Sequence, residues 1–162
     1  MWKPPPRPER TYTTGPVTVW LRRLTLAATA LITVAVLIAF PGMPDTIPVH
    51  FDGSGEADDW GSKVTILLLS ALMVAMIVGV DWCSRRSGSD WFNYPKAVTE
   101  DNAQRMYRAG EQLMVWLNAG MVVLYLAMVA SMTEFTTAPL IIPGMVIVFG
   151  AVIVGLVKTV RA

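Results

Sequence analysis

Four uninterrupted apolar runs constrain this chain more than any other feature. They cover residues 24–40, 64–80, 113–132 and 140–157, and none contains Asp, Glu, Lys or Arg. At about 1.5 Å per residue each run forms a helix of about 26–30 Å, close to the roughly 30 Å hydrocarbon thickness of a bilayer. A water-soluble bundle would need polar outer helix faces, and most charged residues here lie between the runs. The sequence therefore predicts an all-α, polytopic integral membrane protein with four transmembrane helices in contact with the lipid bilayer.

The regions between the runs define the expected organisation. Residues 1–19 are rich in proline, which favours an extended conformation without a core, so we expect a flexible cytoplasmic tail. Residues 20–162 form the membrane domain. Its expected spans are about 22–40, 64–82, 111–132 and 139–158, with an extracytoplasmic loop at 41–63 and a cytoplasmic loop at 83–110.

The distribution of cations predicts the orientation. Of the 13 Lys and Arg residues, all but Lys63 fall in the segments 1–23, 81–112 and 158–161. Four spans place these three segments on one side, and the positive-inside rule makes that side cytoplasmic. Both termini are therefore expected in the cytoplasm. A net charge of +1 lacks the clustered basic surplus that nucleic-acid binding needs, so nucleic acid is not an expected partner.

The loop at 41–63 carries the most specific sequence. It holds five acidic residues, the only histidine of the chain and several turn-forming prolines and glycines. Alternation of apolar and polar residues from Ile47 to Phe51 predicts a short extended segment. We expect this loop to recognise an extracytoplasmic ligand or partner through Pro48, His50, Phe51, Asp52, Gly55, Glu56, Trp60 and Lys63.

Other chemistries for this loop stay open. His50, Asp52 and Glu56 are residue types that bind zinc or calcium, although their spacing matches no established metal-binding pattern. A hydrolytic site would need His50 beside a serine and an orienting acid. A purely structural role, with the acids solvated and Trp60 at the lipid headgroups, is the simplest alternative. We expect no catalysis, no resident metal and no cofactor.

Ionisable residues are nearly absent from the predicted spans. Asp81 and Glu111 fall at cytoplasmic span ends, and Asn118 is the deepest polar residue of the third span. A proton or ion pathway would place carboxylates or histidine near the midplane, so the pattern argues against a stand-alone ion-coupled transporter. Asn118 is expected to form a hydrogen bond between helices.

Small residues recur every fourth position in two spans. Ala71, Ala75 and Gly79 lie on one face of the second span, and Ala151 and Gly155 lie on one face of the fourth. Small residues at this spacing let helices approach closely. We expect packing within the bundle, with a homo-oligomer as the alternative.

The loop also resembles a known family. The segments 44–51 and 55–63, with an Ile-Pro-x-His-Phe string followed by Gly-Glu and Ser-Lys, resemble the motif between the first two spans of SdpI-type immunity proteins. A cytoplasmic motif around Asn93, Tyr94 and Pro95 is similar to the next loop of that family. The resemblance as a whole extends over roughly residues 20–135.

The resemblance implies a multi-pass protein of the bacterial cytoplasmic membrane. It further implies immunity against a secreted toxic peptide, with binding signalled inward to a cytoplasmic regulator. This chain has four predicted spans, fewer than the immunity proteins. An extracellular peptide or toxin and a cytoplasmic regulator are therefore the expected partners. A metal-dependent or hydrolytic membrane enzyme centred on His50 and an accessory subunit of a transporter or envelope complex are the alternatives.

Overall fold

The computed structural model describes residues 7–52, 56–89, 91–134 and 140–162. Within these residues the main helices are α1 (Pro16–Ala39), α2 (Val64–Ser84), α3 (Ala103–Glu134) and α4 (Ile141–Arg161). A short 3-10 helix, η1 (Phe40–Gly42), follows α1, and the strands β1 (Thr46–Phe51) and β2 (Ala57–Ser62) form a hairpin before α2. Each of the four α-helices is long and apolar enough to cross a membrane, which confirms the expected fold class.

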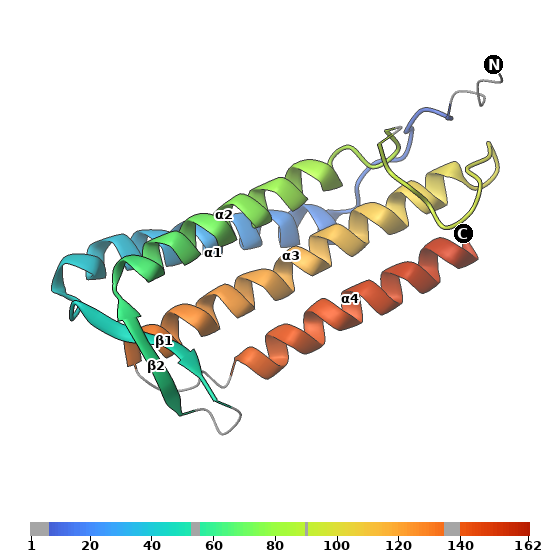
Figure 1. Cartoon of the computed structure of the whole chain (residues 1–162). Helices are drawn as coiled ribbons and strands as arrows, with labels where there is room; N and C mark the ends of the chain where they lie inside the picture. Colours follow the sequence, from blue (N-terminus) through green and yellow to red (C-terminus); the bar gives the residue numbers. More distant parts are fainter. Residues whose placement is uncertain (1–6, 53–55, 90, 135–139) are drawn as a thin grey trace, which may run out of the picture.

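Helix α3 is the centre of the bundle. It contacts α1 and α2, which also contact each other, and it forms the most extensive helix interface of the molecule with α4. Figure 1 shows α1 and α2 on one side of α3 and α4 on the other. The β hairpin lies at one end, which we call the hairpin end, and Ala162 lies at the opposite end, which we call the termini end.

Two helices begin before the membrane spans that the sequence predicted for them. Helix α1 starts at Pro16, inside the expected tail, because proline is well suited to the first turn of a helix. Helix α3 starts at Ala103 rather than near residue 111, because an amphipathic segment precedes its apolar run. The predicted start of the fourth span, residue 139, lies outside the described residues, and α4 begins at Ile141.

Apolar side chains fill the bundle at two levels. Midway along the helices, Met73 and Ile77 of α2 pack against Met121, Val122 and Tyr125 of α3. At the hairpin end, a second cluster joins α1, α2 and α3 to the hairpin. It consists of Val36, Ile47, Ile66 and Met132. Polar links supplement this packing, and the predicted interhelical bond is present, with the Asn118 amide donating to the Ile77 carbonyl oxygen at 3.0 Å.

Glycines allow α4 to approach α3 closely. A Cβ atom added to Gly155 would lie 2.4 Å from Leu113 Cδ1, and one added to Gly144 would lie 2.7 Å from Leu124 Cδ2. This confirms packing at Gly155. By contrast, Ala71, Ala75 and Gly79 lie on the exposed outer face of α2. Small residues at the same four-residue spacing therefore include a packed position in α4 but lie on an exposed face in α2.

Candidate functional site

The hairpin is irregular in the middle of its first strand. Its antiparallel register pairs Ile47 with Gly61 and Pro48 with Trp60, and then shifts on either side of His50, which pairs with Asp59. Such a bulge re-aims side chains and increases local twist. The irregularity therefore occurs at the histidine that the sequence singled out.

One side of the hairpin is anchored to the helices. Ile47 is 1% exposed and packs among side chains of α1, α2 and α3, while Pro48 beside it is also fully buried. Lys63 closes the base of the hairpin, because its ammonium lies 3.0 Å from Asp45 Oδ1 and donates to the Met43 carbonyl oxygen at 3.2 Å. Ile47 and Pro48 thus hold the hairpin against the helices, and Lys63 holds its two ends together.

The hairpin region also exposes acidic side chains. Five of its carboxylates are exposed, namely those of Asp45, Asp52, Glu56, Asp58 and Asp59. His50 Nδ1 lies 2.5 Å from Asp58 Oδ1, and this hydrogen bond raises the pKa of His50 above its ordinary value of 6.5. Trp60 contributes a large aromatic surface, 51% exposed. The arrangement suits recognition of a positively charged partner.

The predicted recognition residues therefore divide into groups. His50, Asp52, Glu56 and Trp60 are exposed, and Phe51 is half-buried. Pro48 is buried, Lys63 is partly buried in its ion pair with Asp45, and Gly55 lies outside the described residues. Among the residues that the structure describes, His50, Asp52 and Glu56 are not brought together as a group able to hold a metal ion.

The termini end holds a charge network that links three helices and is buried at its centre, at Arg22, Asp81 and Glu111. We use this name for Arg10, Arg22, Asp81, Arg85 and Glu111. Arg22 of α1 donates from Nη2 to Glu111 Oε1 of α3 at 2.8 Å, and its Nε lies 3.0 Å from Asp81 Oδ1 of α2 without the alignment of a hydrogen bond. Arg85 Nε reaches Asp81 Oδ2 at 2.9 Å. Charges buried at this depth persist because each has a partner.

The segment before α1 completes the charge network. Arg10 Nη2 lies 3.0 Å from Glu111 Oε2, and the hydroxyls of Tyr12 and Thr14 donate to the same carboxylate. Burial, together with the bond to Glu111, raises the pKa of Tyr12, so its hydroxyl stays protonated as a donor. Arg7 donates to the Ser89 and Phe92 carbonyl oxygens. Residues 7–14 are thus bound to the bundle, unlike the flexible tail expected over 1–19, while residues 1–6 lie outside the described residues.

The predicted cytoplasmic motif lies beside this segment. The Gly88 amide donates to the Tyr94 hydroxyl at 3.2 Å, and the Tyr94 ring lies 5.6 Å from that of Tyr107. Asn93 and Pro95 on either side are exposed. The Tyr107 hydroxyl in turn donates to the Pro8 carbonyl oxygen at 2.9 Å. Tyr94 therefore helps to position the loop after α2 against the segment before α1.

Sequence reasoning missed the charge network. It placed Asp81 and Glu111 at span ends, and it assigned Arg22 to orientation and to contact with the lipid headgroups. A signal was present, because opposite charges fall at matching ends of three different spans. Nothing in the spacing within one segment indicates that they pair across helices.

Comparisons with known proteins match the part of the chain that contains the hairpin. Residues 27–74 match the model of a domain of unknown function, DUF1648. A segment of 52 residues is 40% identical to an uncharacterized protein of Archaeoglobus fulgidus, covering 32% of this chain and 28% of the archaeal protein. No solved structure matches significantly. The DUF1648 match runs from α1 through the hairpin into α2, so this part of the chain is similar to that domain. The four long apolar helices make the chain a multi-pass membrane protein.

Proposed function

We propose that this protein is a non-catalytic receptor of the bacterial cytoplasmic membrane that recognises a basic extracytoplasmic peptide through its hairpin. Following the resemblance to SdpI-type immunity proteins, we propose that the peptide is a secreted toxin. The protein then confers immunity to the toxin or signals its presence. The observation that carries the proposal is the group of exposed acids on the hairpin, with Asp58 paired to His50 and Asp59 beside it. Complementary charge steers association and suppresses partners of the wrong sign.

Signalling would pass through the helices. Ile47 packs against α1, α2 and α3 at the hairpin end, and the same three helices meet in the charge network at the termini end. A peptide that shifts the hairpin would therefore change the helix packing that holds residues 7–14. A cytoplasmic regulator would then bind the released segment. Both termini lie in the cytoplasm in this proposal, as the cation distribution predicts.

Neutralisation of the hairpin acids tests the recognition step. The test variant is Glu56→Gln/Asp58→Asn/Asp59→Asn, and the matched control is Glu9→Gln/Glu100→Gln/Asp101→Asn, whose exposed acids lie at the termini end. Each is expressed in a strain that lacks the gene. Basic peptides are isolated by cation exchange from the culture medium of that organism, and growth of the strain is measured after they are added. We expect the wild type and the control to restore growth and the hairpin variant to fail. Full protection by the hairpin variant would overturn the proposal.

Cysteine labelling tests the proposed orientation. Cys83 is the only cysteine, so a Cys83→Ser background leaves none. In that background Asp59→Cys at the hairpin and Lys96→Cys in the 85–102 segment are each exposed single sites. A membrane-impermeant maleimide added to whole cells should label Asp59→Cys alone. Labelling of Lys96→Cys instead would reverse the orientation.

A further inference from the structure

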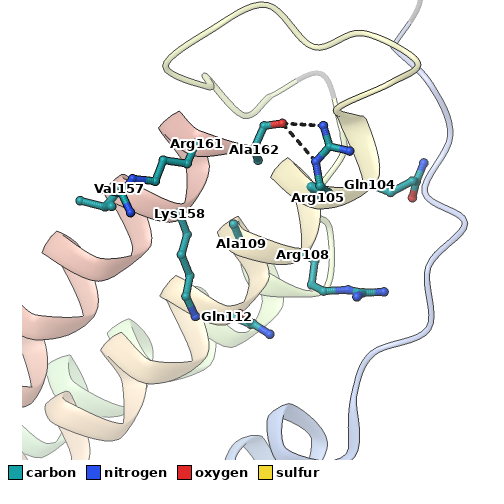
Figure 2. Close-up of a pocket in the computed structure, with 9 residues that line it drawn as sticks. All are labelled: Gln104, Arg105, Arg108, Ala109, Gln112, Val157, Lys158, Arg161 and Ala162. Atoms are coloured by element: carbon teal, nitrogen blue, oxygen red, sulfur yellow. Dashed lines mark hydrogen bonds between the residues drawn. The ribbon is translucent and has the colours of Figure 1, made fainter.

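A basic cavity opens between α3 and α4 at the termini end. Its volume is about 520 Å³, within the range of about 300–1,000 Å³ that small-ligand pockets occupy. Four cations line it, namely Arg105, Arg108, Lys158 and Arg161, and none of its nine lining residues has an acidic side chain. Figure 2 shows that these residues come from facing turns of the two helices.

The cations differ in how they are already engaged. Arg105 donates to the Ala162 main-chain oxygen from Nη2 at 2.8 Å, and the Arg108 guanidinium lies 5.1 Å from the centre of the Tyr12 ring. Within the described part of the chain, neither Lys158 nor Arg161 forms an ion pair. The Lys158 side chain extends along the gap between the helices toward Gln112 (Figure 2).

An apolar depression continues from this cavity toward the middle of the bundle. It shares Ala109, Gln112 and Lys158 with the cavity and adds Leu113, Trp116, Ala151, Val154 and Gly155. The depression is shallow, about 30 Å³, and exposes apolar surface only. Gly155 lets the two helices approach closely here, and we call this depression the groove. The cations and the apolar groove thus follow one another along the helix axes.

We propose that this site binds an anionic phospholipid. Lys158 and Arg161 contact its phosphate, and an acyl chain lies in the groove along Leu113, Trp116 and Val154. A soluble anion or an acidic peptide would use the cations but not the groove, which lies within the membrane-spanning part of both helices. Basic pockets between membrane helices at the headgroup level bind anionic headgroups in this way, and Trp116 is suited to the boundary.

Lipid titration followed by native mass spectrometry tests the proposal. The full chain in detergent is titrated with dioleoyl phosphatidylglycerol, with dioleoyl phosphatidylcholine and with glycerol 3-phosphate. The test variant is Lys158→Gln/Arg161→Gln, and the control is Arg23→Gln/Arg86→Gln, which removes two exposed cations of α1 and of the turn after α2 at the same end. We expect the wild type and the control to prefer phosphatidylglycerol and the test variant to bind it about 10- to 30-fold more weakly.

Four results would overturn the proposal. Equal losses in the two variants would mean that any cation of this end attracts anionic lipid. Equal binding of phosphatidylcholine would remove the role of charge, and competition by glycerol 3-phosphate at the concentration of the lipid would remove the role of the groove. In the last case Lys158 and Arg161 would act on soluble anions. A test variant that binds as well as the wild type would leave them only the role of stabilising the carboxyl end of α4.

Discussion

The two ends of the bundle use the same residue types in opposite ways. At the hairpin end, Asp58 and Asp59 are exposed, and apolar contacts such as those of Ile47 attach the hairpin to the helices. At the termini end, Asp81 and Glu111 are buried, and arginine connects them across three helices. Apolar packing thus attaches the exposed polar hairpin to the helices at one end. At the other end, ion pairs connect the helices to one another.

This contrast separates stability from recognition. An exposed acid can change without leaving a buried partner unsatisfied, so evolution is free to vary it for binding. A buried acid that pairs with arginine cannot, because its loss leaves an uncompensated charge. We therefore expect substitutions at the termini end to act through stability and those on the exposed hairpin face to act through binding.

The largest effect is expected at Glu111. Glu111→Gln removes the carboxylate that receives Arg10, Arg22, Tyr12 and Thr14, and should lower the free energy of unfolding by about 3–5 kcal/mol. Unfolding in mixed micelles measures this loss. The control, Glu100→Gln at an exposed position of the same end, should stay within about 0.5 kcal/mol of the wild type. Equal stability of the two variants would contradict the role assigned to the charge network.

Ile47 should show the next largest effect. Ile47→Ala removes a side chain that three helices enclose and should cost about 2–4 kcal/mol in the same unfolding assay. Thr46→Ala changes an exposed neighbour on the same strand and should cost about 0.5 kcal/mol or less. If Ile47→Ala were as stable as Thr46→Ala, the hairpin would not be anchored through its apolar side.

A smaller effect is expected where α4 meets α3. In Gly155→Ala the new methyl group meets the Leu113 side chain, which must move, and we expect a loss of about 1–3 kcal/mol. Gly150→Ala is the matched control in the same helix, because a Cβ there meets no atom within 4 Å. Since alanine is the better helix former, the control should be neutral or more stable than the wild type. Destabilisation by both variants would show that helix conformation, not packing, sets the effect.

The sequence predicted the features that depend on local chemistry. Apolar run length gave the four membrane helices, and the alternation of Ile47 to Phe51 gave an extended segment, because each of these signals lies within one element. Helix pairing was predicted less well. Gly155 packs against α3, whereas Ala71, Ala75 and Gly79 do not pack inside the bundle, and their spacing alone does not distinguish the two cases.

The charge network shows the same limit more clearly. Its residues come from the segment before α1 and from three helices, and their pairing depends on how the helices rotate about their axes. That rotation is set by all the side chains in the interfaces at once. The prolines near the amino end indicated a flexible tail. The contacts of Arg10 and Tyr12 with Glu111 instead hold this segment against the bundle.

The smallest effect is expected from titration of His50. The hydrogen bond to Asp58 raises the pKa of His50, so the charged pair is complete below pH 6.5 and is lost as pH rises through the raised value. As the only histidine, His50 gives one imidazole signal by NMR. Asp58→Asn should return its pKa toward 6.5, and Asp59→Asn should lower it less, since Asp59 acts only through space. An unchanged pKa in Asp58→Asn would contradict the pairing.

The same titration changes the charge that a basic peptide would meet. Protonated His50 offsets one carboxylate of the hairpin, and its deprotonation makes the exposed face more acidic. If the hairpin recognises a basic peptide, its affinity should rise by a small factor as pH passes through the raised pKa, and this step should be absent in His50→Gln. A pH step that persists in His50→Gln would assign it to another group, while an affinity that falls with rising pH would favour a partner that binds the protonated imidazole itself.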